Sequence, residues 1–288
     1  MMARGKSDLA AKADAFRALH AGPKLLVLPN AWDAASAVLI QAAGFPAIAT
    51  SSAGCASALG FGDGNQVPRK EMLAAVRRIA ASVEIPVSAD MESGYGSGPE
   101  SASRLAEELI EAGAIGLNLE DGTCDAAKPF KDLSQSVEEI RAIRETSDRA
   151  GVRLVINART DTYWEGRGTA DENFAQAMRR CRAYCEAGAD CSFLPGLKDL
   201  ALIERFVSEV GGPLNVLPWP GMPGFTELER IGLRRLSFGG TTSRSAYGNF
   251  RRLLQELANG GGVEEILKGY GLTYQEMNSL FAKRSAAH

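Results

Sequence analysis

The chain has 288 residues, of which 45% are hydrophobic, and 32 Lys and Arg against 35 Asp and Glu give a formal net charge of −3. This balance gives no sign of a nucleic-acid or membrane surface, and no apolar run is long enough to span a bilayer. Residues 1–20 mix charged side chains among alanines, so they do not form a signal peptide. We expect a cytoplasmic enzyme or binding protein.

Cysteine and histidine usage narrows the possible chemistry. The five cysteines are odd in number and lack C-x-x-C spacing, and the only histidines are His20 and His288. A catalytic histidine or a histidine-ligated zinc is therefore not expected. The chemistry must rely on carboxylates, Arg, Ser, Tyr, Cys or a metal.

Strand-like and helix-like segments alternate along the chain after an N-terminal helix over residues 7–20. Eight short apolar runs rich in β-branched residues are predicted strands, at 25–29, 47–51, 87–92, 116–121, 154–161, 191–194, 214–218 and 236–239. Amphipathic stretches between them are predicted helices, at 69–82, 101–112, 136–149, 172–186 and 200–210. The starts of the predicted strands fall roughly 20 to 40 residues apart, which is the spacing of βα units.

Eight βα units in about 250 residues predict a (β/α)₈ TIM barrel. No Pro- or Gly-rich linker divides the chain, so we expect a single domain over residues 1–288, with the barrel at about 22–258. Helices predicted at 243–258, 263–269 and 274–282 exceed what a single barrel needs. The last two of these helices form a C-terminal helical extension at about 259–288.

The third predicted strand carries two acids, Asp90 and Glu92, just before a Gly-Tyr-Gly turn. Side chains two residues apart on a strand point to the same face, so these carboxylates are expected to converge. Converging acids repel each other unless a cation or a shared proton relieves them. Oxygen ligands of this kind suit Mg²⁺ or Mn²⁺.

Other strand ends add polar groups to the same barrel mouth, where TIM barrels carry their chemistry. Asp63 and Glu120 add acids, and Arg159 offers a planar fork for a carboxylate or phosphate. Pairing of Arg159 inside the barrel with Glu120 or Asp161 is an alternative, and both roles can coexist. These residues suggest a divalent metal beside an anionic substrate.

Small residues end the second strand at Ser51-Ser52-Ala53-Gly54, where backbone N–H groups can approach a bound carboxylate. A tight turn that binds no ligand is the alternative.

The ordered set of these segments resembles the phosphoenolpyruvate mutase/isocitrate lyase superfamily from about Leu25 to Gly240. The resemblance rests on Pro29-Asn30-Ala31-Trp32-Asp33, Ala49-Thr50-Ser51-Ser52, Ala58-Leu59-Gly60-Phe61-Gly62-Asp63, Asp90-Met91-Glu92-Ser93-Gly94-Tyr95-Gly96, Asn118-Leu119-Glu120-Asp121 and Asn157-Ala158-Arg159-Thr160-Asp161. The second acid of the Asp90 segment is commonly Asp in this family and is Glu here, which keeps the charge but lengthens the reach.

The resemblance implies a role for each site residue. Asp90 would lie closest to Mg²⁺ (or Mn²⁺), and Asp63, Glu92 and Glu120 would order its water ligands. The predicted substrate contacts are Ser51, Ser52, Ala53, Asn157 and Arg159, and the predicted catalytic residues are Arg159, Glu120 and Asp63.

One departure from the family concerns the lid after the fourth strand. The C–C lyases carry a Lys-Lys/Arg-Cys-Gly-His motif there, whereas this chain has Glu120-Asp121-Gly122-Thr123-Cys124-Asp125. The Asn-bearing lid of the P–C mutases is absent too. We therefore expect a site without these lids, in which Cys124 is an incidental thiol, the alternative being that it acts as an acid or base.

The predicted activity is Mg²⁺-dependent C–C cleavage or decarboxylation of a small α-oxo or α-hydroxy (di)carboxylate through a metal-stabilised enolate. A P–C mutase or hydrolase acting on a phosphonopyruvate-like substrate, and a non-catalytic oxo-acid binding protein, are the alternatives. The resemblance also implies a homodimer or homotetramer built by exchange of C-terminal helices, whose apolar stripes include Leu253, Leu254 and Leu257. A tail folded back over its own barrel is the alternative.

Overall fold

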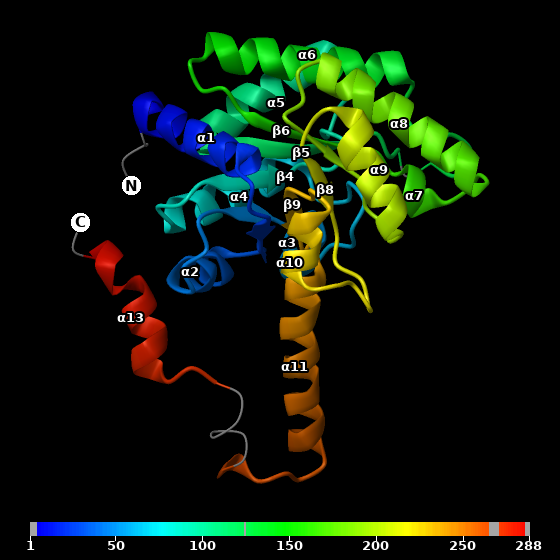
Figure 1. Cartoon of the computed structure of the whole chain (residues 1–288). Helices are drawn as coiled ribbons and strands as arrows, with labels where there is room; N and C mark the ends of the chain where they lie inside the picture. The colour runs from blue at the N-terminus through cyan, green and yellow to red at the C-terminus, as the bar shows by residue number, and fades with distance from the viewer. Residues whose placement is uncertain (1–4, 124, 265–270, 286–288) are drawn as a thin grey trace.

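The structure, a computed structural model, describes residues 5–123, 125–264 and 271–285. Parallel strands form one sheet surrounded by helices (Figure 1). The strands are β1 Leu26–Leu28, β2 Asn30–Ala31, β3 Ile48–Thr50, β4 Val87–Asp90, β5 Gly116–Glu120, β6 Val155–Arg159, β7 Cys191–Phe193, β8 Leu214–Val216 and β9 Arg235–Ser237. No helix in these ranges is long and apolar enough to cross a membrane.

The first predicted strand consists of two short strands that together close the barrel. β1 pairs with β9, and β2 pairs with β3, so the two ends of the sheet meet at the residue between them, Pro29. Pro29 has no N–H to give to a ladder, but its carbonyl accepts a 3.1 Å hydrogen bond from the Ala49 N–H. The eight predicted strands and the (β/α)₈ architecture are therefore confirmed.

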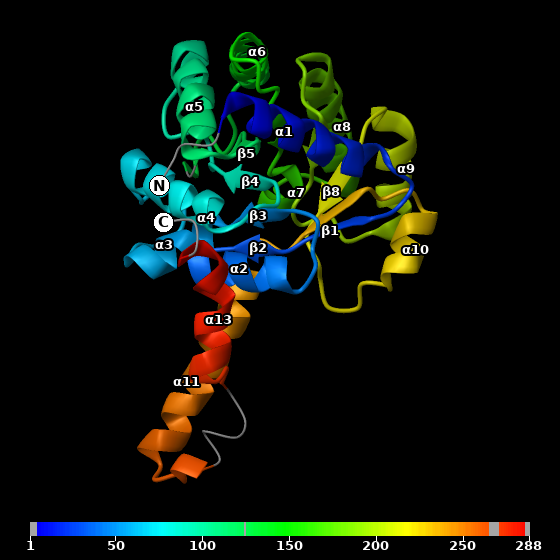
Figure 2. The ribbon, with the colours of Figure 1, turned by 90° about the vertical axis from the view of Figure 1, so that its left-hand side faces the viewer.

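Helices cover the outside of the barrel, as Figure 2 shows from the side. They are α1 Lys6–Ala21, α2 Ala34–Ala42, α3 Ser52–Leu59, α4 Arg69–Ser82, α5 Gly98–Ala112, α6 Leu133–Arg149, α7 Thr162–Glu165, α8 Ala170–Glu186, α9 Leu200–Val210, α10 Phe225–Arg230, α11 Thr241–Ala258 and α13 Tyr274–Ser285. The predicted helices agree with these within a few residues, but α2, α3, α7 and α10 were not predicted.

Strand alternation puts apolar side chains outside the barrel and polar ones inside it. On β5, Leu117 and Leu119 belong to the apolar core that packs with the helices. Asn118, between them, faces inward, where its Oδ1 accepts a 2.7 Å hydrogen bond from Asn157 Nδ2 on β6. The inside of this barrel is thus a hydrogen-bonded polar layer beneath the mouth.

A buried arginine and a buried histidine lie together below that layer, on the floor of the barrel. Arg235 is fully buried, and its guanidinium nitrogens lie 3.4 Å from His20 Nε2 and 3.4 Å from Asn118 Oδ1. The other His20 ring nitrogen lies 2.8 Å from the Phe16 carbonyl oxygen. Burial, together with the charge of Arg235, lowers the pKa of His20 to about 4. His20 is therefore neutral at pH 7 and has a structural role.

A second charged cluster joins α1 and α6 to the lower end of β7. The Asp190 carboxylate accepts hydrogen bonds from Arg17 Nε at 3.1 Å, Arg144 NH2 at 2.5 Å and the Ile156 N–H at 2.8 Å. Two arginines and one backbone group thus hold a single acid at the base of the barrel wall.

The C-terminal helices leave the barrel. α11 projects away from it and α13 runs back towards α2 (Figures 1 and 2). Within α11 Ser243 is buried, whereas four large apolar side chains, Tyr247, Phe250, Leu254 and Leu257, are exposed. Leu280 and Phe281 of α13 pack against the core. The helix predicted at 263–269 lies mostly outside the described residues, and helix exchange stays a prediction.

Candidate functional site

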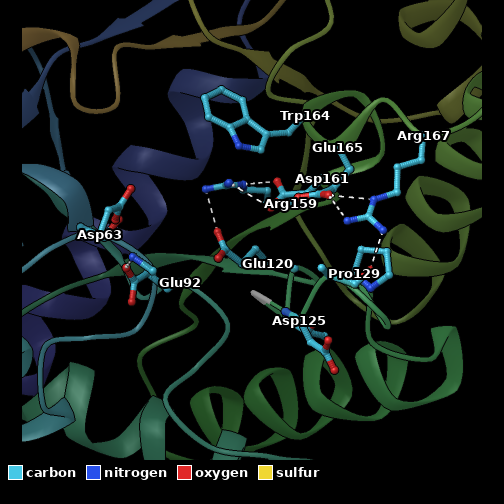
Figure 3. Close-up of a pocket in the computed structure, with 15 residues that line it drawn as sticks. Asp63, Glu92, Glu120, Asp125, Pro129, Arg159, Asp161, Trp164, Glu165 and Arg167 are labelled. Carbon is cyan, nitrogen blue, oxygen red and sulfur yellow. Dashed lines mark hydrogen bonds and ion pairs between the residues drawn. The ribbon is translucent and has the colours of Figure 1, made fainter.

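A cavity opens at the carboxyl ends of the strands and has two connected compartments of about 290 and 280 Å³. Both are lined by Ser52, Asp63, Arg159 and Trp164. Figure 3 shows the first compartment, with Asp63, Glu92 and Glu120 on one side and Arg159 bonded to Glu120 and Asp161. We name it the acidic compartment.

Asp90 ends β4 and is held from two sides. Its Oδ2 accepts hydrogen bonds from the Ser52 N–H at 3.0 Å and the Ser52 hydroxyl at 2.9 Å, and Asn118 Nδ2 lies 3.4 Å from its Oδ1. Ser52 is the first residue of α3, whose N-cap is Ser51, so the segment starts a helix. The Ser52 N–H that was predicted to bind substrate is donated to Asp90 instead.

Glu92 reaches the site by a route that differs from the prediction. β4 ends at Asp90, and Glu92 lies in a turn with φ of 48°, so strand alternation does not direct its side chain. Its carboxylate accepts hydrogen bonds from the backbone N–H groups of Gly64 at 3.3 Å and Asn65 at 2.8 Å. Burial, together with the charges of Asp90 and Asp63, raises the pKa of Glu92 to about 7.

Arg159 ends β6 and lies between two acids. Its NH1 lies 2.7 Å from Glu120 Oε2, and its Nε and NH2 lie 2.5 and 3.0 Å from the two oxygens of Asp161. Burial raises the pKa of the Glu120 carboxyl well above its usual range, despite the opposing charge of Arg159. A guanidinium has five N–H donors, so donors remain for a substrate anion. Arg159 thus pairs with both acids, where the sequence had suggested pairing with Glu120 or Asp161 as an alternative role.

The remaining predicted residues divide into those at the cavity and one beneath it. Ser51 and Ala53 line the second compartment, and exposed Asp63 lines both. Asn157 is fully buried and lines neither compartment, because it bonds Asn118 one layer below Arg159. The structure therefore does not bring Asn157 to the cavity.

The loop after β5 lines one side of the acidic compartment, and its sequence carries neither of the two family lid motifs. Gly122 and Phe130 form an antiparallel bridge, and the Thr123 N–H donates to the Pro129 carbonyl at 3.1 Å. Arg167, from the segment between α7 and α8, donates to the Ala126 carbonyl at 2.6 Å. The loop thus lies folded against the mouth, while Cys124 falls outside the described residues.

Trp164, Lys198, Trp219 and Arg244 are among the lining residues that were not predicted. They lie on α7, on the loops after β7 and β8, and at the start of α11. The sequence of these segments contains none of the motifs described above. The only sign that they line the cavity was that each segment follows the carboxyl end of a strand.

The chemistry of the donors fits a hard divalent cation that keeps most of its water. Asp63, Asp90, Glu92, Glu120 and Asp161 line the cavity beside the partly buried guanidinium of Arg159. Among the described residues, no three His, Cys, Asp or Glu side chains are grouped so that they could hold one metal ion together. Mg²⁺ usually retains several waters and takes one or two protein carboxylates, so one contacting acid with others beyond the waters is a suitable arrangement.

Comparisons with known proteins agree with this architecture. The family model for phosphoenolpyruvate phosphomutase matches residues 16–258. The 2-methylisocitrate lyase of Escherichia coli is 32% identical over 220 residues, which cover 74% of this chain and 72% of that protein.

Two solved structures are also similar. A Burkholderia cenocepacia protein with a provisional assignment as a lyase or mutase has a TM-score of 0.87 and 35% identity, covering 96% of this chain and 97% of the other. An oxaloacetate acetylhydrolase bound to its product oxalate has a TM-score of 0.83 and 26% identity, covering 97% and 96%. The chain is thus an enzyme of the phosphoenolpyruvate mutase/isocitrate lyase superfamily.

Proposed function

We propose that this chain, using Mg²⁺, acts on a small 2-oxo or 2-hydroxy acid, either by cleaving a C–C bond within it or by decarboxylating it. The observation that carries the proposal is the surplus of carboxylates at the barrel mouth, where Asp90 is oriented by Ser52 and Glu92 has a raised pKa. Such a surplus destabilises the ligand-free protein, so its presence supports a bound cation. Relatives that act on 2-methylisocitrate and oxaloacetate support the substrate class.

Each site residue then has a defined task. Asp90 would contact the metal, and Asp63, Glu92 and Glu120 would hold its waters. Mg²⁺ would supply Lewis-acid stabilisation of an enolate. Arg159 binds the acid group of the substrate with the N–H donors that Glu120 and Asp161 leave free. Ser51 and Ala53 line the cavity beside that group.

Turnover of oxaloacetate, followed by proton NMR with Mg²⁺ and with EDTA, tests the proposal. We expect enzyme-dependent loss of oxaloacetate that stops in EDTA. Mg²⁺ also promotes this reaction in solution, so the Asp90→Ala protein is the control for the background rate. Equal rates with the wild type and with Asp90→Ala would contradict the proposed role of Asp90. A panel of 2-alkylmalates and 2-methylisocitrate extends the same test to C–C cleavage.

P–C chemistry is the second candidate, because the guanidinium of Arg159 fits a phosphonate as well as a carboxylate. Phosphorus NMR of phosphonopyruvate incubated with enzyme and Mg²⁺ distinguishes the two reactions. Release of phosphate, or formation of a phosphate ester, without turnover of any C–C substrate would favour this candidate. Binding of 2-oxo acids without turnover would identify a non-catalytic binding protein.

We further propose that α11 and α13 pack on a second copy of the chain, where α13 would take the place against α2 that it takes within this chain, giving a dimer or tetramer. Exposed Tyr247, Phe250, Leu254 and Leu257 along α11 support this, because a projecting helix rarely leaves such a stripe in water. Deleting residues 262–288 should give unstable or aggregating protein, since folding and assembly are then linked. A well-folded, active monomer in light scattering would overturn this assembly.

A further inference from the structure

Asp161 bonds the guanidinium of Arg159 from a position where an acid ordinarily does something else. Asp161 is the N-cap residue of α7, yet its side chain caps no backbone N–H of that helix. Aspartate at an N-cap usually accepts such a hydrogen bond. Here both carboxylate oxygens bond Arg159 instead, one with Nε at 2.5 Å and the other with NH2 at 3.0 Å. The acid thus serves the arginine and not its own helix.

This pairing decides which part of Arg159 is left for a ligand. Asp161 takes Nε and one hydrogen of NH2, and Glu120 lies 2.7 Å from NH1. The remaining N–H groups of the guanidinium are therefore on its two terminal nitrogens. Bidentate binding of a substrate carboxylate by these nitrogens depends on the orientation of the guanidinium plane. Asp161 sets that orientation, because it bonds two of the three nitrogens.

The carboxylate of Asp161 occupies space that the missing side chain of Gly122 leaves open. A Cβ added to Gly122 would lie 2.6 Å from Asp161 Oδ2, closer than real Cβ atoms approach their neighbours. The same Cβ would lie 3.8 Å from Glu120 Oε1, which is an ordinary contact. The φ angle of Gly122 is outside the left-handed region, so its backbone conformation does not itself require glycine. The position of the Asp161 carboxylate is what excludes a side chain there.

Asp121, the residue before Gly122, holds the backbone of Asp161. Its Oδ1 accepts a 3.0 Å hydrogen bond from the Asp161 N–H. Its Oδ2 accepts hydrogen bonds from Arg180 NH1 at 3.1 Å and from the Tyr184 hydroxyl at 2.7 Å, both on α8. The buried Asp121 thus fixes the start of α7 relative to α8.

We infer that Asp161 is a positioning residue that orients Arg159 for the acid group of the substrate, and that Asp121 and Gly122 hold Asp161 in place. The inference rests on the proposed function, in which Arg159 binds that acid group. The rival account is that Asp161 only competes with the substrate for Arg159. Competition predicts that disturbing Asp161 frees donors and tightens the binding of an anion, whereas orientation predicts that it weakens the binding.

Gly122→Ala tests this contact without changing the charge of the site. The probe is oxalate, titrated by calorimetry into the protein at a fixed, saturating concentration of Mg²⁺. The added methyl group should displace the Asp161 carboxylate and weaken oxalate binding about ten-fold, as loss of one charged hydrogen bond does. Mg²⁺ affinity, titrated without oxalate, should keep its wild-type value, because the methyl group makes only an ordinary contact with Glu120. Gly224→Ala, whose added Cβ meets nothing within 4 Å, is the matched control.

A double-mutant cycle with Asp161→Ala separates this contact from general damage to the fold. Asp161→Ala should also weaken oxalate binding, and in that background Gly122→Ala should cause no further loss, because the methyl group then enters vacated space. Additive losses, or tighter binding in either single variant, would overturn the inference. If the Gly122→Ala protein did not fold, Asp161→Ala alone would still decide between orientation and competition by the sign of its effect.

Arg159→Ala identifies a failure of the proposed function itself. If this variant bound oxalate as tightly as the wild type, or if the wild type bound no oxalate, the role of Arg159 would be refuted and the inference with it. If Arg159→Ala lost oxalate binding while Gly122→Ala retained it in full, the inference alone would fail.

Discussion

The mouth and the floor of the barrel differ in whether their acidic side chains are balanced by basic ones. At the mouth, several carboxylates surround Arg159, and burial raises the pKa of Glu92 to about 7. On the floor, Asp190 is matched by Arg17 and Arg144, and Arg235 lies against a neutral His20. Asp190 on the floor is thus balanced by two arginines of the chain, whereas the mouth leaves a negative surplus for a ligand to balance. Changes at the mouth should therefore reduce function, and changes on the floor should reduce stability.

The largest expected effect is that of Asp90→Ala at the mouth. Removing the acid nearest the metal should lower turnover at least roughly 10²–10³-fold, as loss of one electrostatic contact to a developing charge does. Mg²⁺ or Mn²⁺ affinity, measured by titration calorimetry, should fall as well, while circular dichroism and Tm show an intact barrel. Asp171→Ala, on the exposed face of α8, is the matched control. Unchanged metal affinity in Asp90→Ala would refute the assignment.

The converse change is Asp190→Ala on the floor. It leaves Arg17 and Arg144 without their shared acid, so the free energy of unfolding should drop by about 3 kcal/mol. Denaturant titration at fixed protein concentration measures this, and metal affinity should stay at its wild-type value. Glu227→Ala breaks an exposed pair with Arg230 and should change stability by less than about 0.5 kcal/mol. If the Asp190→Ala protein were as stable as the wild type but bound the metal more weakly, the floor would serve function and not stability, contrary to this prediction.

A smaller effect follows from the lowered pKa of His20. The unfolded chain takes up a proton near pH 6.5, whereas folded His20 resists protonation until about pH 4. Stability from this group is thus complete above pH 6.5 and is lost as the pH falls, by about 2 kcal/mol at pH 5. His20→Gln should flatten the pH dependence of Tm between pH 7 and 5. An equally steep dependence in that variant would show that other groups cause it.

The smallest effect is expected from Cys124→Ser. If the thiol is incidental, kcat and KM on the substrate that the enzyme turns over should stay within about two-fold, which is a change of about 0.4 kcal/mol in the barrier. A large fall in kcat with little change in KM would instead show that Cys124 acts in the transition state.

The parts of the molecule that were predictable from sequence lie on strands or in motifs. Asp90, Glu120 and Arg159 end apolar strands, so periodicity and the ordered motifs placed them at one mouth. Glu92 was predicted at the site for an incomplete reason, since a left-handed turn and not the strand directs it. For Asn157 the predicted direction was right, since the side chain points into the barrel. Its level was not, because it lies below the cavity.

Residues whose position depends on barrel closure were not predictable. Lys198, Trp219 and Arg244 come from loops or a helix start, and only the pairing of β7, β8 and β9 brings them around one space. His20 and Arg235 meet across almost the whole length of the chain. A single sequence without contact information offers no local pattern for such pairs.

The interruption at Pro29 has a consequence for synthesis on the ribosome. β1 cannot pair until β9 has been synthesised, because Leu26 pairs with Arg235, more than 200 residues further along the chain. β2, just past the proline, can pair with β3 as soon as Ala49 and Thr50 emerge. At roughly 5–20 residues per second of translation, the first half of this one strand stays unpaired for about 10–40 s after the second half has found its neighbour. Until β9 emerges, β1 therefore remains an open edge of the nascent barrel, to which a chaperone or a neighbouring nascent chain can bind.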